Sequence, residues 1–223
     1  MDKHLRSVVE KRVARTAEAL TRNNMEVHCL ESRKDVIPAL ASLLRQGEVV
    51  AHGGSMTLAQ CGVPEWLKTV PVTYLDRDMP GLSPADRQEM MRRALLSDTY
   101  LTSVNAILEE GALYLVDGNG NRAAAMLYGP RRVIVVAGVN KIVSSLSEAV
   151  DRVRTIACPA TVARLERPTW CRKQGHCIAF DHPDGGKIAG CGRESICNDF
   201  VLLRNQTIPG RIQILLVMED LGY

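Results

Sequence analysis

Residues 132–141 read RVIVVAGVNK, and this stretch decides the fold. Its run from Val133 to Val139 is the longest apolar run in the chain. A strand that is apolar on both faces is typical of the centre of a parallel sheet with helices on both sides. Strand and helix patterns alternate along the rest of the chain, as parallel strands with helical crossovers require. We therefore predict an α/β fold with a mainly parallel sheet.

The periodicity of the sequence around this strand predicts the other elements. Apolar residues at helical spacing indicate a helix over 3–22, and Ser83-Pro84 is a typical helix start. We expect strands over 26–30, 48–52, 70–75, 99–103, 113–116, 132–137 and 211–218. We expect further helices over 35–45, 55–61, 83–96, 105–110 and 144–165, the last with a break near Pro159. The chain is expected to form one domain (1–223), with a helical N-terminal part (1–46), a cysteine-rich segment (168–200) and a closing strand (211–218).

Composition argues against several classes of function. The 223 residues include 28 Lys and Arg against 25 Asp and Glu, and the net charge of +3 is spread along the chain. Nucleic-acid-binding domains concentrate basic charge, and single-strand binders use aromatic side chains, which make up 4% of this sequence. No apolar run approaches the roughly 20 residues that a membrane span needs, and the charged N-terminus lacks a signal-peptide core. We expect a cytoplasmic protein that binds neither nucleic acid nor membranes.

Three loops are candidates for a ligand site, because α/β sheets bind ligands beyond the carboxyl ends of their strands. The first loop contains Gly53, Gly54, Ser55 and Thr57. Its glycines allow backbone N–H groups to approach a ligand closely, and its hydroxyls add further donors. This loop suits a phosphate or a carboxylate. A glycine turn with a capping serine and no ligand is an equally good interpretation.

The second and third loops add charged groups. Residues 117–122 combine Asp117, Asn121 and Arg122, and the Arg122 guanidinium can make a bidentate contact with a carboxylate or phosphate. Asp-Gly and Asn-Gly pairs also form plain turns, so this loop has a structural interpretation as well. Asn140 and Lys141 directly follow the most apolar strand. Lys141 is either a cation in the site or a solvated residue at a helix start.

Cysteines are concentrated near the C-terminus. Four of the seven lie within 27 residues, at Cys171, Cys177, Cys191 and Cys197. Four thiolates suit zinc or an iron–sulfur cluster, although the five-residue gaps differ from the C-x2-C pattern of most structural zinc sites. A disulfide or redox pair, and four cysteines without a joint role, are the alternatives. Two further histidines are possible substitute ligands (His176 and His182), and three scattered cysteines are expected to be small buried hydrophobes (Cys29, Cys61 and Cys158).

Taken together, these segments resemble the LUD-domain family, which is named for lactate utilization. The resemblance rests on residues 53–57, 105–112, 116–122, 128–130, 133–141, 193–198 and 221–223. It implies a three-layer α/β/α sandwich of the NagB/RpiA/CoA-transferase-like group. It also implies a link to the oxidation of L-lactate to pyruvate alongside iron–sulfur proteins. Two features depart from the family: a longer gap between Cys177 and Cys191, and Ser103-Val104 where relatives carry Thr-Gly.

Three functions are compatible with these observations. The leading hypothesis is a component or accessory subunit that oxidises a small 2-hydroxy acid, with a [4Fe–4S] cluster, or zinc as the second choice, on the four clustered cysteines. The second is a non-redox enzyme for a phosphorylated or acyl-CoA substrate, with Asp117 or Glu110 as acid or base. The third is a metal-stabilised binding module without catalysis, and a homo-oligomer is compatible with all three. In the enzyme hypotheses Asp117, Arg122 and Lys141 are catalytic, and a small anion is bound by Gly53, Gly54, Ser55, Thr57, Asn105, Asn121 and Asn140.

Overall fold

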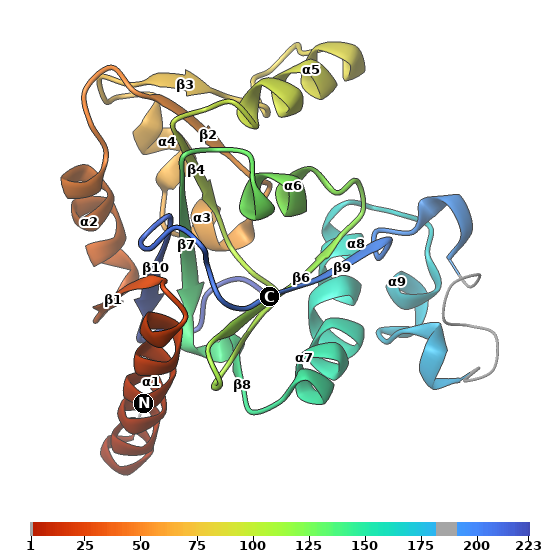
Figure 1. Cartoon of the computed structure of the whole chain (residues 1–223). Helices are drawn as coiled ribbons and strands as arrows, with labels where there is room; N and C mark the ends of the chain where they lie inside the picture. The colour runs from red at the N-terminus through yellow and green to blue at the C-terminus, as the bar shows by residue number, and fades with distance from the viewer. Residues whose placement is uncertain (1, 182–190) are drawn as a thin grey trace.

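The larger of two β-sheets forms the centre of the molecule (Figure 1). The computed structural model describes residues 2–181 and 191–223. The sheet has six strands in the order β1-β10-β7-β4-β2-β3, and every neighbouring pair is parallel. Because all strands run the same way, their carboxyl ends meet at one edge of the sheet. The strands are β1 (Glu26–Leu30), β2 (Val49–His52), β3 (Thr73–Leu75), β4 (Thr99–Thr102), β7 (Arg132–Gly138) and β10 (Ile212–Val217).

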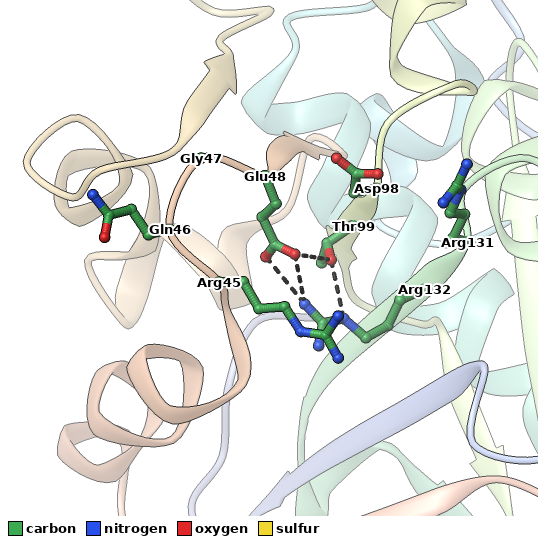
Figure 2. A pocket seen from close by; sticks show the side chains of 8 residues that line it. All are labelled: Arg45, Gln46, Gly47, Glu48, Asp98, Thr99, Arg131 and Arg132. Carbon is green, nitrogen blue, oxygen red and sulfur yellow. Dashed lines mark hydrogen bonds and ion pairs between the residues drawn. The ribbon is translucent and has the colours of Figure 1, made fainter.

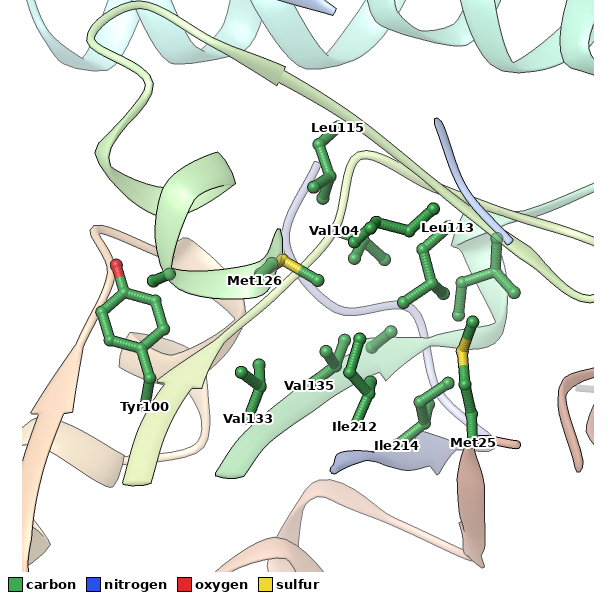
Figure 3. Close-up of a cluster of buried hydrophobic side chains, with 14 of the residues drawn as sticks. Met25, Tyr100, Val104, Leu113, Leu115, Met126, Val133, Val135, Ile212 and Ile214 are labelled. Atoms are coloured by element: carbon green, nitrogen blue, oxygen red, sulfur yellow. The ribbon is translucent and has the colours of Figure 1, made fainter. Parts of the chain in front are cut away.

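The apolar stretch at 132–138 is an inner strand of this sheet, as predicted. β7 lies between β10 and β4, and its side chains alternate between two hydrophobic clusters. Val133 and Val135 face the cluster in Figure 3, which includes Tyr100 of β4 and Met126. Ile134 and Val136 face the opposite cluster, which helices cover. The prediction of an α/β fold with a mainly parallel sheet and helices on both faces is confirmed.

Helices cover both faces of the six-stranded sheet. On one side lie α2 (Val36–Leu43), α3 (Met56–Gln60) and α4 (Val63–Leu67), whose buried side chains belong to the second cluster. The other side receives α1 (Lys3–Arg22), α5 (Pro84–Ala94) and α6 (Asn121–Leu127). Ser83 caps α5 by accepting a hydrogen bond from the backbone N–H of Asp86, as its sequence predicts. None of the helices described is both long enough and apolar enough to cross a bilayer.

A second, four-stranded sheet corrects one sequence-based prediction. Its order is β8-β5-β6-β9, with β5 (Ala106–Leu108), β6 (Ala112–Asp117), β8 (Ile142–Val143) and β9 (Asp199–Leu203). The helix expected over 105–110 is wrong, because residues 106–108 form a fully buried strand paired with β6 and β8. Gly111, three residues after β5, adopts φ +91° and turns the β5–β6 hairpin. A side chain there would also collide with the Ala19 carbonyl of α1.

Behind the second sheet, a helical segment carries the chain into the cysteine-rich region. α7 (Leu146–Arg152) continues through a π-helical turn at Val153–Ala157 into α8 (Cys158–Arg164), and α9 (Trp170–Gln174) follows. The expected break near Pro159 is therefore a widened turn and not a helix end. A wide turn tolerates proline because the missing N–H costs no regular helical hydrogen bond there.

The scattered cysteines are buried in two of three cases. Cys61 and Cys158 are buried as expected, but Cys29 is exposed. The prediction for Cys29 is wrong because β1 is an edge strand of the six-stranded sheet, and its Cys29 side chain has no covering layer.

Candidate functional site

A cavity of about 390 Å³ lies at the carboxyl edge of the six-stranded sheet, where the second sheet and the cysteine-rich segment meet it. Loops after β2, β3, β4 and β6 supply one part of its wall, and α8 and residues 193–198 supply another. Eight of the residues predicted from the sequence line this cavity, so the structure brings them together. They are Gly54, Ser55, Thr57, Asn105, Asp117, Asn121, Arg122 and Lys141.

Two other predicted residues contact the segments around the cavity without lining it. Gly53 packs so closely on Tyr100 that an added Cβ would lie 2.9 Å from the tyrosine Oη. Asn140 donates from Nδ2 to the Gly222 carbonyl at 3.2 Å and accepts at Oδ1 from the Leu221 N–H at 3.1 Å. Gly53 and Asn140 therefore position the loop and the C-terminal residues, and neither lines the cavity.

The Arg122 guanidinium ties three segments of the cavity wall together. Its Nε donates to Asp117 Oδ1 at 2.8 Å, its Nη1 to the Ser103 carbonyl at 3.1 Å, and its Nη2 to Asn105 Oδ1 at 2.8 Å and the Val116 carbonyl at 2.8 Å. Arginine has five N–H groups, so four of them are used by residues that the structure describes. Arg122 is mainly a positioning group, with one N–H left for a ligand.

Both oxygens of the Asp117 carboxylate accept hydrogen bonds. Besides the Arg122 contact, its Oδ2 accepts a 2.7 Å hydrogen bond from the backbone N–H of Ala123, at the start of α6. The Asp117 residue is 8% exposed. Carboxylates held this way orient the groups around them, so Asp117 fixes the guanidinium and the first turn of α6.

Lys141 is the most unusual titratable group in the cavity. Its residue is 2% exposed, and its Nζ donates to Thr57 Oγ1 at 3.0 Å, Ser103 Oγ at 2.9 Å and the Val104 carbonyl at 3.1 Å. Among the residues described, no carboxylate pairs with this ammonium group. Burial, with the charges of Arg152 and Arg122, lowers the pKa of Lys141 to about 7. The amine is therefore partly unprotonated at neutral pH.

Arg77 is a cavity residue that the sequence analysis missed. It follows β3, and its buried Nε has no hydrogen-bond acceptor in the part of the chain that the structure describes. Asp78 Oδ1 lies 3.7 Å from this atom, beyond hydrogen-bond reach. A hydrogen bond from His52 holds the pKa of Asp78 below its usual range, so this carboxylate is engaged elsewhere. The signal for Arg77 was its place two residues after a predicted strand.

The cavity wall carries a strong excess of positive charge. Six arginines and one lysine line it, against two aspartates, among the residues described. Besides Arg77, Arg122 and Lys141, the basic residues are Arg87, Arg164, Arg167 and Arg193. Arg164 donates to the Tyr223 hydroxyl at 2.7 Å, and Arg167 pairs with Glu194 at 2.9 Å. Such a wall favours an anionic ligand.

Two cysteines, Cys158 and Cys197, meet on the side of the cavity formed by α8. The Sγ atoms of Cys158 and Cys197 lie 2.9 Å apart, and Cys158 itself lines the cavity. The hydrogen bond between them raises the pKa of Cys158 and lowers that of Cys197, so Cys158 keeps the proton. The sequence analysis correctly predicted that Cys158 is buried, but it did not predict the contact with Cys197.

The other predicted ligands lie within electrostatic reach of this pair. Burial mainly raises the pKa values of Cys171 and Cys191, and the charges of Cys177 and Cys197 add to both shifts. Thiols are soft donors that suit zinc or iron. Across residues 2–181 and 191–223, no three or more metal-binding side chains are arranged to hold an ion. His176 contacts Asp181 at 2.7 Å, and His182 lies outside the described residues.

A second cavity, of about 430 Å³, lies at the opposite edge of the sheet (Figure 2). There Arg132 contacts both carboxylate oxygens of Glu48 at 3.0 Å and also donates to Thr99 Oγ1 and the Leu43 carbonyl. This network joins the amino ends of the strands to α2. Because ligands of α/β sheets bind at the carboxyl edge, we assign this cavity a structural role.

One solved structure agrees with this architecture, and a family model matches most of the chain. The sequence profile of the LUD domain matches residues 13–217. A crystal structure of a DUF162 family protein from Deinococcus radiodurans is similar over 95% of this chain and 98% of its own, with 17% identity and a TM-score of 0.51. The β subunit of eIF2B from Chaetomium thermophilum matches 52% of this chain and 44% of its own, with 17% identity and a TM-score of 0.35. The δ subunit of eIF2B from the same organism matches 53% of this chain and 50% of its own, with 14% identity and a TM-score of 0.34. No curated protein matches the sequence.

Proposed function

Because the chain belongs to the LUD-domain family, named for lactate utilization, we propose that it is a component of the oxidation of L-lactate to pyruvate. In this proposal the cavity at the carboxyl edge binds the carboxylate of the small 2-hydroxy or 2-oxo acid. The observation that carries the proposal is the charge of the wall, where six arginines face two aspartates among the described residues. Carboxylates leave water only when they are paired, and this wall offers the pairing.

Arg77 is the residue we assign to carboxylate binding. Its buried Nε lacks an acceptor among the described residues, and its side chain is 21% exposed. A bound carboxylate would accept from the two terminal Nη groups together, a bidentate geometry that arginine favours. Arg122 would add its one remaining N–H, while Asn105 and Asn121 would meet the other polar atoms of the acid.

Lys141 is the residue we assign as the base. Oxidation of a 2-hydroxy acid to a 2-oxo acid removes two electrons and two protons, one of them from the hydroxyl. Burial lowers the pKa of Lys141 to about 7, which matches the task of a general base at neutral pH. Thr57 and Ser103 hold its Nζ by hydrogen bonds of 3.0 and 2.9 Å.

The electrons need an acceptor, because no amino-acid side chain of the cavity supplies one. We propose Cys171, Cys177, Cys191 and Cys197 as ligands of an iron–sulfur cluster, with zinc as the alternative metal. The described residues do not form a metal site in advance, so binding of the cluster would draw these thiols together. Support comes from their soft donor type and from the charge interactions among these thiols. A [4Fe–4S] cluster held by these cysteines would take one electron at a time, so iron–sulfur partner proteins would have to accept both electrons in turn. Breaking the C2–H bond would need a redox cofactor on such a partner, because the cavity has no side chain that accepts its hydrogen and electrons.

Metal analysis tests the cluster assignment. Protein purified without oxygen should contain about four iron atoms and about four sulfides per chain. Cys171→Ser combined with Cys197→Ser should remove the iron, because two ligands are lost, while Cys29→Ser, which alters an exposed cysteine of β1, should keep it. Zinc in place of iron would favour the structural-metal alternative, and a protein with no metal would contradict the assignment.

A ligand panel tests the substrate class. Pyruvate and L-lactate should raise the melting temperature, since a ligand that binds the folded state stabilises it. The volume of about 390 Å³ is within the range of pockets for larger ligands, and this favours a phosphorylated or acyl-CoA substrate as the second candidate. A shift with a sugar phosphate or acyl-CoA, without one for pyruvate or lactate, would overturn the proposal in favour of that candidate.

A further inference from the structure

Ser103 supplies a hydroxyl that the oxidation proposed above does not need. It directly follows β4, lines the cavity and is 3% exposed. Its Oγ lies 2.9 Å from Nζ of Lys141 and 3.3 Å from Oγ1 of Thr57. A serine hydroxyl within hydrogen-bond reach of an amine, with that amine held in place by a third group, is the arrangement of an activated nucleophile.

The hydrogen bonds around Lys141 can be satisfied when the amine is neutral. A neutral amine has two N–H donors and one lone pair. Its two donors can serve Thr57 Oγ1 and the Val104 carbonyl, at 3.0 and 3.1 Å, and its lone pair can accept the Ser103 hydroxyl. Thr57 then donates onward to the Leu221 carbonyl at 3.3 Å. The network therefore has a complete arrangement in which Ser103 points its proton at Lys141.

We propose that Ser103 is a nucleophile, that Lys141 is its base, and that the cavity takes the acyl group of an ester or thioester bearing an anionic group. This activity does not rest on the lactate proposal. It uses the same cavity but requires neither the cysteines nor an electron acceptor. The anionic character of the substrate follows from the wall of six arginines.

The chemical step balances without a redox partner. Ser103 Oγ forms a bond to the carbonyl carbon while its proton passes to Lys141 Nζ. The bond from that carbon to the leaving oxygen or sulfur breaks, and Lys141 returns the proton to the leaving group. Water then hydrolyses the serine ester, releasing the carboxylic acid and restoring the hydroxyl. Arg122, whose Nη1 donates to the Ser103 carbonyl at 3.1 Å, has one N–H left to stabilise negative charge that develops there.

The test compares two chromogenic esters of similar length and different charge. Mono-4-nitrophenyl succinate carries a carboxylate, and 4-nitrophenyl butyrate does not. With the succinate ester we expect a burst of one equivalent of nitrophenolate per chain and a succinyl adduct mapped to Ser103 by mass spectrometry. We expect the neutral ester to acylate the protein at least about tenfold more slowly, because it forgoes a charge-assisted contact.

Variants separate the proposed nucleophile and base from the rest of the cavity. Ser103→Ala and Lys141→Met should slow acylation by about 100-fold or more, the usual contribution of such groups. The matched control is Ser97→Ala, because Ser97 is 2% exposed and bonds only the Ala94 and Thr99 carbonyls among the described residues. It should acylate at the wild-type rate. If Ser103→Ala does not fold, Ser103→Cys replaces it, and the adduct must then lie on the introduced thiol.

The pH dependence identifies the base. The charged groups acting on Lys141 are Arg152 of α7 and Arg122 of α6, which with burial lower its pKa to about 7. The acylation rate should therefore rise with pH and level off above about 7. The proposal would be overturned if Ser103→Ala were acylated at the wild-type rate or if the adduct lay on a residue other than Ser103. An acylation rate that still rises at pH 9 would also overturn it. Pyruvate binding by Ser103→Ala is a separate readout of the lactate proposal.

Discussion

Replacing Arg122 with leucine should lower the free energy of unfolding by about 3–5 kcal/mol, the usual cost of removing one partner of a buried ion pair. The Arg122 and Asp117 side chains are 17% and 9% exposed. The variant leaves the Asp117 carboxylate uncompensated and removes the donors to the Ser103 and Val116 carbonyls. Urea unfolding followed by circular dichroism measures the difference.

Two comparisons make this result specific. Arg87→Leu removes another arginine from the cavity wall, but an exposed one whose side chain makes no hydrogen bond to the described residues, and it should change stability by less than about 0.5 kcal/mol. Arg122→Leu combined with Asp117→Leu should be more stable than Arg122→Leu alone, because it leaves no unpaired charge. An Arg122→Leu variant as stable as Arg87→Leu would show that Arg122 does not hold the wall together.

Lys141 should make the stability of the protein depend strongly on pH. Its pKa is lowered from 10.5 to about 7 in the folded chain. Between these values the unfolded chain holds the proton and the folded chain does not, so stability increases as pH rises through this window. A pKa shift of one unit corresponds to 1.36 kcal/mol, so the unfolding free energy should increase by about 5 kcal/mol across the whole window.

The difference between wild type and Lys141→Met isolates this effect. Wild type should gain stability relative to Lys141→Met between pH 6 and pH 10. Burial raises the pKa of Cys61 to about 11, so this thiol lowers stability at alkaline pH, but it does so in both proteins and cancels in the difference. For Lys34→Met, which changes an exposed lysine, the plot of unfolding free energy against pH should run parallel to that of wild type. Parallel curves for wild type and Lys141→Met would contradict the assignment of Lys141 as a buried neutral amine.

Local patterns in the sequence predicted the sheet and the loops at its edge. The strand over 132–138 could be recognised because both of its faces are apolar. Because ligands of such sheets bind beyond the strand ends, the sequence also pointed to Gly54, Thr57, Asp117 and Lys141, which line one cavity. The hairpin at 106–112 was missed for the same local reason. Three apolar residues followed by two glutamates and a glycine fit a short helix as well as a strand, and only pairing with β6 and β8 decides between them.

Residues whose roles depend on distant contacts were not predictable in this way. Cys158 meets Cys197 across 39 positions of sequence, so no spacing pattern links them. Ser103 looked like a departure from the family pattern, and its importance comes from Lys141, which is 38 positions away. The sequence placed the end of β3 at Leu75, but no local pattern showed that the Nε of Arg77, two residues later, is buried without an acceptor among the described residues. Each of these needed the tertiary fold to bring its partner close.

Isothermal titration of pyruvate into wild type, Arg77→Gln and Arg131→Gln tests the anion site most directly. Arg77 lines the carboxyl-edge cavity, and the exposed Arg131 lines the cavity at the other edge of the sheet. Charge-assisted hydrogen bonds contribute about 1.5–3 kcal/mol, so Arg77→Gln should weaken binding by roughly 10- to 100-fold while Arg131→Gln matches wild type. Absence of pyruvate binding to wild type, or equal affinity in Arg77→Gln, would contradict the account.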